Sequence, residues 1–253
     1  MKASRILDME KYITGQGSAS MEELCQTFNV SINTVRRDVV ELIRRGTVEK
    51  VYGGVTARKS DQQLTPYEER RISREAVKAA IGRKAAELVQ DGDIIFIDSG
   101  TTTLQMIDCL AQKRDLTVIT NNMEAVIRAL PYENMTVIVL PGQLSRKTNS
   151  LTGDDTVSSL RRYNIRAAFM AATGLSAHGA TNSSPREYEI KRAAIANSEK
   201  VYLLVNQEKI GLTGLMTFAP VSVFDAVVTD ARPGSEAAEL LQKENVELIH
   251  SGS

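Results

Sequence analysis

Apolar residues from Ile6 to Phe28 recur with the three- and four-residue spacing of helices. A first helix, ending near Gly15, is predicted by Ile6, Leu7, Met9, Tyr12 and Ile13. Ser20 lies three residues before Glu23, which is the spacing of a capping box and marks the start of a second helix. The pattern therefore predicts two short amphipathic helices before Asn29.

A third helix is predicted between Ser31, which suits an N-cap, and Gly46, which suits a helix end. Its predicted buried stripe is Val35, Val39, Leu42 and Ile43. The following run, TVEKVYGGV, alternates apolar and polar residues and closes on two glycines, as a hairpin does. Three helices followed by a hairpin predict a winged helix-turn-helix.

The rest of the chain alternates short apolar runs with helical patterns. Candidate strands are IIFID (94–98), TVITN (117–121), TVIVL (136–140), AAFMAAT (167–173), VYLLV (201–205), AVVT (226–229) and VELI (246–249). Such alternation predicts a mostly parallel α/β sheet covered on both faces. Ligands of open α/β sheets bind beyond the carboxyl ends of the strands, so the loops there are the candidate site.

Polar side chains face outward near the start of the third helix if its apolar stripe faces inward. The DNA-binding candidates are Ser31, Asn33, Thr34, Arg36 and Arg37. Arginine pairs with guanine and asparagine with adenine, whereas serine and threonine suit phosphate oxygens. A solvated face is the alternative interpretation of the arginines, and Arg44 and Arg45 at the far end suit the helix dipole. The helix-turn-helix pattern favours DNA binding.

Charge and composition limit the remaining classes. The chain has 253 residues and no net charge, but residues 1–59 hold ten basic and seven acidic side chains. No run of about 18 apolar residues predicts a membrane span, and the charged N-terminus lacks a signal sequence. We therefore expect a cytoplasmic protein with reduced Cys25 and Cys109. No cofactor is expected, and two histidines, His178 and His250, make a zinc site improbable.

The loop DSGTTT, from Asp98 to Thr103, follows the first apolar strand of this region and precedes the helical pattern LQMIDCL. Its backbone N–H groups and hydroxyls suit an anion, with Gly100 allowing close approach. It lacks the lysine of a Walker A loop and the spacing of a dinucleotide fingerprint, so a small phosphate fits better than ATP or NAD. A tight turn with a threonine N-cap explains the same residues, and both interpretations stay open.

Further small polar loops follow the other strands: TNN (120–122), PGQ (141–143) and TG (173–174). Together they predict a polar crevice that suits a hydroxylated ligand. Lys209 follows a later strand, where it would neutralise a phosphate or simply be solvated.

The segment NVSINTVRRDVVELIRRGTVEKVYGGV resembles the helix-turn-helix signature of the DeoR family of bacterial regulators. Other segments of this chain resemble landmarks of that family's sensor domain: DSGTTT, TNN, ATGLSAHGAT, the Glu187 to Arg192 segment and Lys209 with Gly211. The resemblance implies a winged helix-turn-helix, double-stranded operator DNA as partner, and a sensor domain that shares the ribose-5-phosphate isomerase-like fold. The implied domains are 1–57 for DNA binding, 58–75 as a linker and 76–253 for sensing.

The resemblance also implies a pocket for a phosphorylated sugar or polyol. Its residues would be Asp98, Gly100, Thr101, Thr102, Thr103, Asn121, Gly142, Glu187 and Lys209. Two departures from the family pattern lie near this pocket. Gln143 stands where the family commonly has a second glycine. Asn206, Gln207 and Glu208 precede Lys209, where the family commonly has an Asp–x–Ser/Thr–Lys pattern.

Three functions fit these observations. The leading one is a repressor of a carbohydrate or polyol catabolic operon that its effector releases from DNA. An activator or dual regulator is an alternative, and a sugar-phosphate isomerase is another, although the acidic motifs of those enzymes are absent. One short recognition helix gives little contact, so we expect a homodimer or homotetramer.

Overall fold

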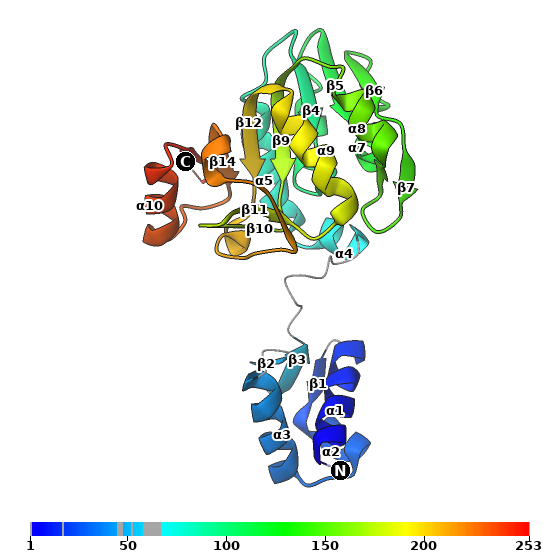
Figure 1. Ribbon diagram of the computed structural model, residues 1–253, viewed down its shortest axis with the longest axis vertical. Coiled ribbons are helices and arrows are strands. Elements are labelled where there is room, and N and C mark those ends of the chain that lie inside the picture. Colours follow the sequence, from blue (N-terminus) through cyan, green and yellow to red (C-terminus); the bar gives the residue numbers. More distant parts are fainter. Residues whose placement is uncertain (1, 17, 45–47, 52, 58–66, 253) are drawn as a thin grey trace. The chain divides into compact units, whose positions relative to one another are not determined.

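The computed structural model describes residues 2–16, 18–44, 48–51, 53–57 and 67–252. The chain divides into two compact units, Met1–Ser60 and Asp61–Ser253 (Figure 1). Each has its own hydrophobic core, as the change in sequence pattern predicts.

The N-terminal unit contains three helices and a small antiparallel sheet. The helices are α1 (Lys2–Gln16), α2 (Met21–Phe28) and α3 (Ile32–Arg44), and the strands are β1 (Ser18–Ser20), β2 (Val48–Val51) and β3 (Gly54–Ala57), in the order β1-β3-β2. The predicted capping box is present, because Ser20 Oγ accepts from the Glu23 N–H and the Glu23 carboxylate accepts from the Ser20 N–H. The winged helix-turn-helix prediction is confirmed.

The two glycines of the wing have separate physical reasons. Gly53 has a φ of +81°, a conformation that side chains disfavour. At Gly54 a Cβ atom would lie 2.3 Å from the carbonyl oxygen of Ala19, because β1 packs against β3 there. The strand β1 was not predicted, since three residues carry no periodic signal.

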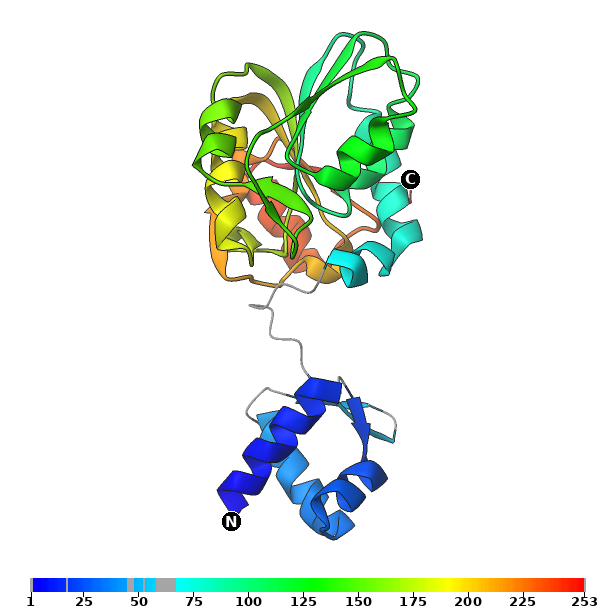
Figure 2. The same cartoon turned by 90° about the vertical axis from the view of Figure 1, so that its right-hand side faces the viewer.

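The C-terminal unit is built on a seven-stranded parallel sheet in the order β15-β14-β12-β9-β4-β5-β6 (Figures 1 and 2). Its strands are β4 (Ile94–Ile97), β5 (Leu116–Thr120), β6 (Met135–Val139), β9 (Ile165–Ala171), β12 (Ser198–Leu204), β14 (Ala226–Thr229) and β15 (Glu247–His250). All seven predicted strands are confirmed within a few residues. Two apolar clusters pack on its opposite faces, which explains the apolar runs.

Helices cover both faces of this sheet. They are α4 (Tyr67–Ile72), α5 (Glu75–Ala86), α6 (Met106–Cys109), α7 (Met123–Ala129), α8 (Asp154–Leu160), α9 (Pro185–Ala196) and α10 (Ser235–Lys243), with 3-10 turns η1 (Thr103–Gln105), η2 (Gln207–Lys209) and η3 (Val221–Val223). Two small antiparallel sheets were not predicted: β7 (Gln143–Ser145) with β8 (Ser150–Thr152), and β10 (Gly174–Ser176) with β11 (Gly179–Asn182) and β13 (Met216–Ala219).

Two sequence expectations differ from the structure. Ile43 was assigned to the buried stripe of α3 but is 38% exposed, and Asp38 is buried instead. The second half of the expected linker is also ordered, because α4 packs on the C-terminal unit with Tyr67 only 3% exposed. Residues 58–66, with Arg45 and Gly46, lie outside the described residues.

No helix among the described residues is long and apolar enough to cross a membrane.

Candidate functional site

The start of α3 carries the candidate DNA-contacting residues. Val35, Val39 and Leu42 are buried, which turns Ser31, Asn33, Arg36 and Arg37 to solvent, with Thr34 partly exposed. Within the described part of the chain, neither Arg36 nor Arg37 forms an ion pair. Arg44 differs, because it pairs with Glu41 at 2.9 Å. The exposed start of α3 can therefore offer two arginines to a polyanion.

A buried ion pair fixes the orientation of α3. Arg5 Nε of α1 donates to Asp38 Oδ2 at 2.7 Å, and Asp38 is 1% exposed. The pair ties α1 to the helix that carries the exposed arginines. The apolar pattern does not predict this ion pair, because Asp38 interrupts the apolar stripe.

In the C-terminal unit, the loops after β4, β9 and β12 meet around one buried pair. Asp98 follows β4, and its Oδ2 atom accepts from Lys191 Nζ of α9 and from the Ala171 N–H, at 2.9 Å for the latter. Lys191 Nζ also donates to the Ala171 carbonyl at 2.9 Å. Both charged residues are at most 3% exposed. The pair fixes the Asp98 carboxylate at the carboxyl end of the sheet.

Glu187 lies one turn before Lys191 on the same face of α9. Its Oε1 atom accepts from Ser99 Oγ of the DSGTTT loop and from Ser150 Oγ of β8, at 2.8 Å for the latter. Lys209 of η2 donates to the Ala172 carbonyl at 2.9 Å, beyond the end of β9. The structure thus links Asp98 and Glu187 through the Ser99 hydroxyl and places Lys209 just beyond the end of β9.

The DSGTTT loop has three backbone donors in a row. The N–H groups of Gly100, Thr101 and Thr102 donate to no other residue in the described ranges. Thr103 closes the loop internally, because its Oγ1 atom lies 2.8 Å from the Asp98 carbonyl oxygen and 2.9 Å from that of Gly100. Successive N–H groups without an acceptor in a turn are the type of donor that binds an anion.

Two glycines assigned to the pocket have packing reasons instead. At Gly100 a Cβ atom would lie 2.2 Å from Ala171 Cβ, so glycine lets the loop pack on β9. At Gly142 a Cβ atom would lie 2.3 Å from Thr156 Oγ1. Packing therefore requires glycine at both positions, and close approach of an anion at Gly100 stays a prediction.

Asn121, after β5, lies beside the loop. Its Nδ2 atom donates to the Leu151 carbonyl at 3.0 Å, and among the described residues its buried Oδ1 atom has no hydrogen-bond partner. An unpartnered buried acceptor suits a ligand hydroxyl.

The basic side chains of the site repel one another. Burial and then Arg70, Lys78 and Lys191 lower the pKa of Lys209 to about 8. Burial and then Arg70 lower the pKa of Lys78 to about 8, opposed by Glu75. Lys209 is therefore within electrostatic reach of Arg70, Lys78 and Lys191. A bound anion would relieve the repulsion between them.

Sequence analysis missed three members of this cluster. Lys191 could have been found, because it lies four residues after Glu187 and so shares its helix face. Arg70 lies in the expected linker and Lys78 near the start of the expected sensing domain, and only the tertiary fold brings them to the loop.

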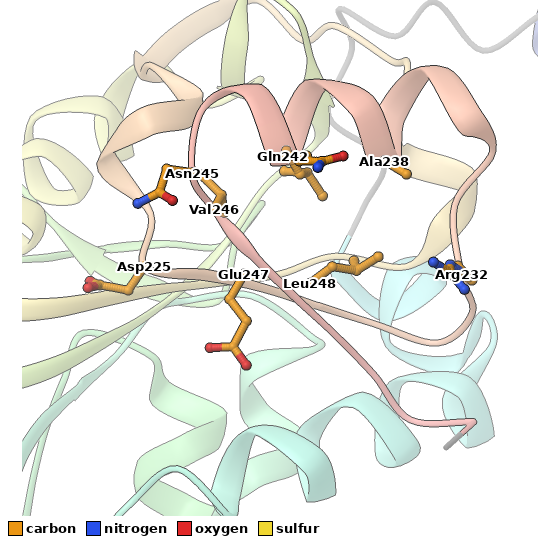
Figure 3. Close-up of a pocket in the computed structure, with 9 residues that line it drawn as sticks. Asp225, Arg232, Ala238, Gln242, Asn245, Val246, Glu247 and Leu248 are labelled. Carbon is orange, nitrogen blue, oxygen red and sulfur yellow. The ribbon is translucent and has the colours of Figure 1, made fainter.

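A hollow of about 440 Å³ lies between α10 and the strands β14 and β15, of which β15 is the edge strand (Figure 3). Asp225 and Arg232 lie at opposite ends of it (Figure 3). Asp225 is already engaged by Lys200 Nζ at 2.7 Å and by the Val201 N–H. This hollow offers no cluster of donors for an anion.

Both units of the chain match models of known protein families. Residues 5–61 match the DeoR-like helix-turn-helix domain, and residues 73–231 match the DeoR C terminal sensor domain. The chain belongs to the DeoR family. It is therefore a transcriptional regulator with a DNA-binding domain, and the isomerase alternative is set aside.

Several DeoR-family relatives are similar to this chain over nearly their whole length. The HTH-type transcriptional regulator IolR of Bacillus subtilis is 43% identical over 90% of this chain and 91% of its own. The glycerol-3-phosphate regulon repressor of Escherichia coli is 30% identical over 92% of each chain. The HTH-type transcriptional repressor GlcR of B. subtilis is 28% identical over 97% of this chain and 95% of its own.

Among solved structures, a D-ribose-5-phosphate isomerase in complex with phospho-erythronic acid matches 54% of each chain, with a TM-score of 0.41 and 14% identity.

Proposed function

We propose that this DeoR-family protein represses a carbohydrate or polyol catabolic operon and that a phosphorylated sugar or polyol releases it from its operator. Two relatives that match it over nearly their full length are named repressors. The basic cluster beside the DSGTTT loop carries the effector half of the proposal. Arg70, Lys78 and Lys209, together with the N–H groups of Gly100, Thr101 and Thr102, suit the charge and the oxygen atoms of one phosphate.

The rest of the effector would meet the polar end of the sheet. Asp98 and Glu187 offer carboxylate oxygens, and Asn121 offers an unpartnered oxygen, so a ligand with several hydroxyls has acceptors for them. In this proposal Lys209, Thr101 and Thr102 bind phosphate, and Thr103 keeps the loop in shape. Gly100 and Gly142 act through packing.

On the DNA side, Arg37 and Asn33 would read base edges from the major groove, while Arg36, Ser31 and Thr34 would contact phosphates. We propose a homodimer or homotetramer, since paired recognition helices read half-sites about 34 Å apart.

A thermal-shift screen of sugar and polyol phosphates, each beside its unphosphorylated form, tests the effector. Ligand at about 100 times its Kd stabilises the protein by about 2.7 kcal/mol. At least one phosphorylated compound should stabilise the protein and release a labelled operator fragment, and its unphosphorylated form should do neither. Equal effects of both forms would refute phosphate recognition.

A further inference from the structure

The helix α4 is the first described element of the C-terminal unit, and its position depends on tertiary contacts. It has only six residues, too few for a stable isolated helix. Tyr67 is 3% exposed, whereas Ile72 is 64% exposed, so one side of the helix packs on the unit. The contacts on that side therefore fix the position of Tyr67, where the described part of the unit begins.

The contacts that hold α4 come from the proposed phosphate site. The carbonyl of Arg70 accepts from Lys78 Nζ and from Thr101 Oγ1, at 3.5 Å for the latter. Thr101 belongs to the DSGTTT loop, and Lys78 belongs to the basic cluster. The backbone of α4 is therefore tied to two side chains that would meet the phosphate.

The side chain of Arg70 packs on an aromatic ring of its own helix. Its guanidinium carbon lies 5.4 Å from the centre of the Tyr67 ring. Burial lowers the pKa of Arg70, and the nearby carboxylates of Glu187 and Asp98 partly oppose that effect. Arg70 thus lies among the acids and lysines of the site, although it belongs to a different element from all of them.

We propose that α4 responds to whether the site is occupied, an inference that rests on the proposed function. Arg70 contacts the bound phosphate and thereby holds α4 in place. A ligand shifts an equilibrium only if it binds one state better than the other. Arg70 supplies that difference, because the phosphate gains this contact only while α4 is docked. The chain after Ala57 leads to α4, so docking of α4 is how the effector would act on the DNA-binding unit.

Hydrogen exchange of the α4 amides tests the proposal, with inorganic phosphate as the probe and chloride at equal ionic strength as the control. Phosphate should slow exchange of these amides in the wild type by about 5- to 150-fold, the usual size of a coupling between sites. Arg70→Met should abolish the slowing. Arg70→Lys keeps a positive charge and should restore part of it, which a purely structural role would not predict.

Arg71→Met is the matched control. Arg71 lies on the same helix but pairs with Glu68 at 2.9 Å and is 41% exposed. This variant should respond to phosphate like the wild type. A thermal shift with phosphate serves as the separate readout of binding.

The outcomes separate the two proposals. Phosphate that stabilises the wild type without slowing α4 exchange would overturn the role of α4 and leave the phosphate site standing. Phosphate that gives neither a thermal shift nor protection would overturn both. Equal loss of the response in the Arg70→Met and Arg71→Met variants would also overturn the role of Arg70. If Arg70→Met does not fold, the wild type, Arg70→Lys and Arg71→Met give the same decision.

Discussion

Two groups of basic side chains in this protein differ in their surroundings. Arg36 and Arg37 of α3 are exposed, whereas Lys78 and Lys191 of the sensor site are buried. Exposed cations keep their hydration and suit a long polyanion, with affinity that depends on salt. Buried cations are desolvated, so each favours a fixed partner close by, such as a carboxylate or a single compact anion. The sequence shows only basic residues in both places, and the difference in their burial appears only in the fold.

The largest expected effect is on stability and comes from the buried group. Lys191→Met leaves the Asp98 carboxylate buried without its partner, so the free energy of unfolding of the C-terminal unit should fall by about 3–5 kcal/mol. Urea denaturation measures it. Lys200→Met is the control, because the exposed Lys200–Asp225 pair should contribute only about 0–1 kcal/mol.

If Lys191→Met and Lys200→Met lower the free energy of unfolding equally, the Asp98–Lys191 pair is not desolvated. The double variant Asp98→Asn/Lys191→Met should recover part of the loss, since neither charge is then left alone.

The next effect concerns the exposed group. Arg37→Ala should weaken specific operator binding by about 1–3 kcal/mol, the value of a bidentate base contact. Arg44→Ala is the control on the same helix, because Arg44 pairs with Glu41 at its far end. Gel-shift titration compares them. Unchanged operator affinity in the Arg36→Ala/Arg37→Ala double variant would refute the assignment of α3 as the recognition helix.

The pH dependence of effector binding follows from the lowered pKa values of Lys78 and Lys209, both about 8. A bound phosphate favours the charged lysines and raises their pKa. Affinity should therefore be full below pH 8 and fall above it, by up to about tenfold per pH unit for each proton lost. The second pKa of a phosphate monoester is about 6, so the ligand itself keeps its charge in this window.

Calorimetric titration of the effector across this pH range measures the decline. Lys209→Arg keeps its charge and should make the decline shallower. The same lysines bind more protons in the unfolded chain between pH 8 and their usual pKa of 10.5, so the free energy of unfolding without ligand should rise with pH there. Affinity that is flat from pH 7 to 10 would show that these lysines do not meet the phosphate.

The smallest effect is on the salt dependence of DNA binding. If Arg36 contacts a phosphate, Arg36→Ala should reduce the slope of log affinity against log salt by about 0.9. Operator titrations at several salt concentrations give the slope. An unchanged slope with lower affinity would place Arg36 on a base edge.

Much of the fold could be predicted from the sequence, because its signals are local. Buried parallel strands read as apolar runs such as IIFI, and the Ser20–Glu23 spacing marks a helix start. The strands of the small antiparallel sheets were missed because three or four mostly polar residues have no period. Asp38 was missed because its burial depends on Arg5, which lies 33 residues away.

The site was predictable where it follows strand ends. Asp98 and Asn121 come directly after the neighbouring strands β4 and β5, and Lys209 lies in the turn after β12, which is one strand away from β4. Arg70 could not be found this way, because its place depends on how α4 packs. The role of Gly100 could not be predicted either, since only the structure shows Ala171 beneath it.

Operator release by a phosphorylated effector, compared between wild type and Lys209→Met, tests the central claim most directly. The account predicts that both proteins bind operator with equal affinity, and that the phosphorylated compound releases the wild type at a far lower concentration than the variant. The unphosphorylated compound should release neither. If the unphosphorylated compound releases the wild type equally well, or Lys209→Met responds normally, the basic cluster beside DSGTTT is not the phosphate site.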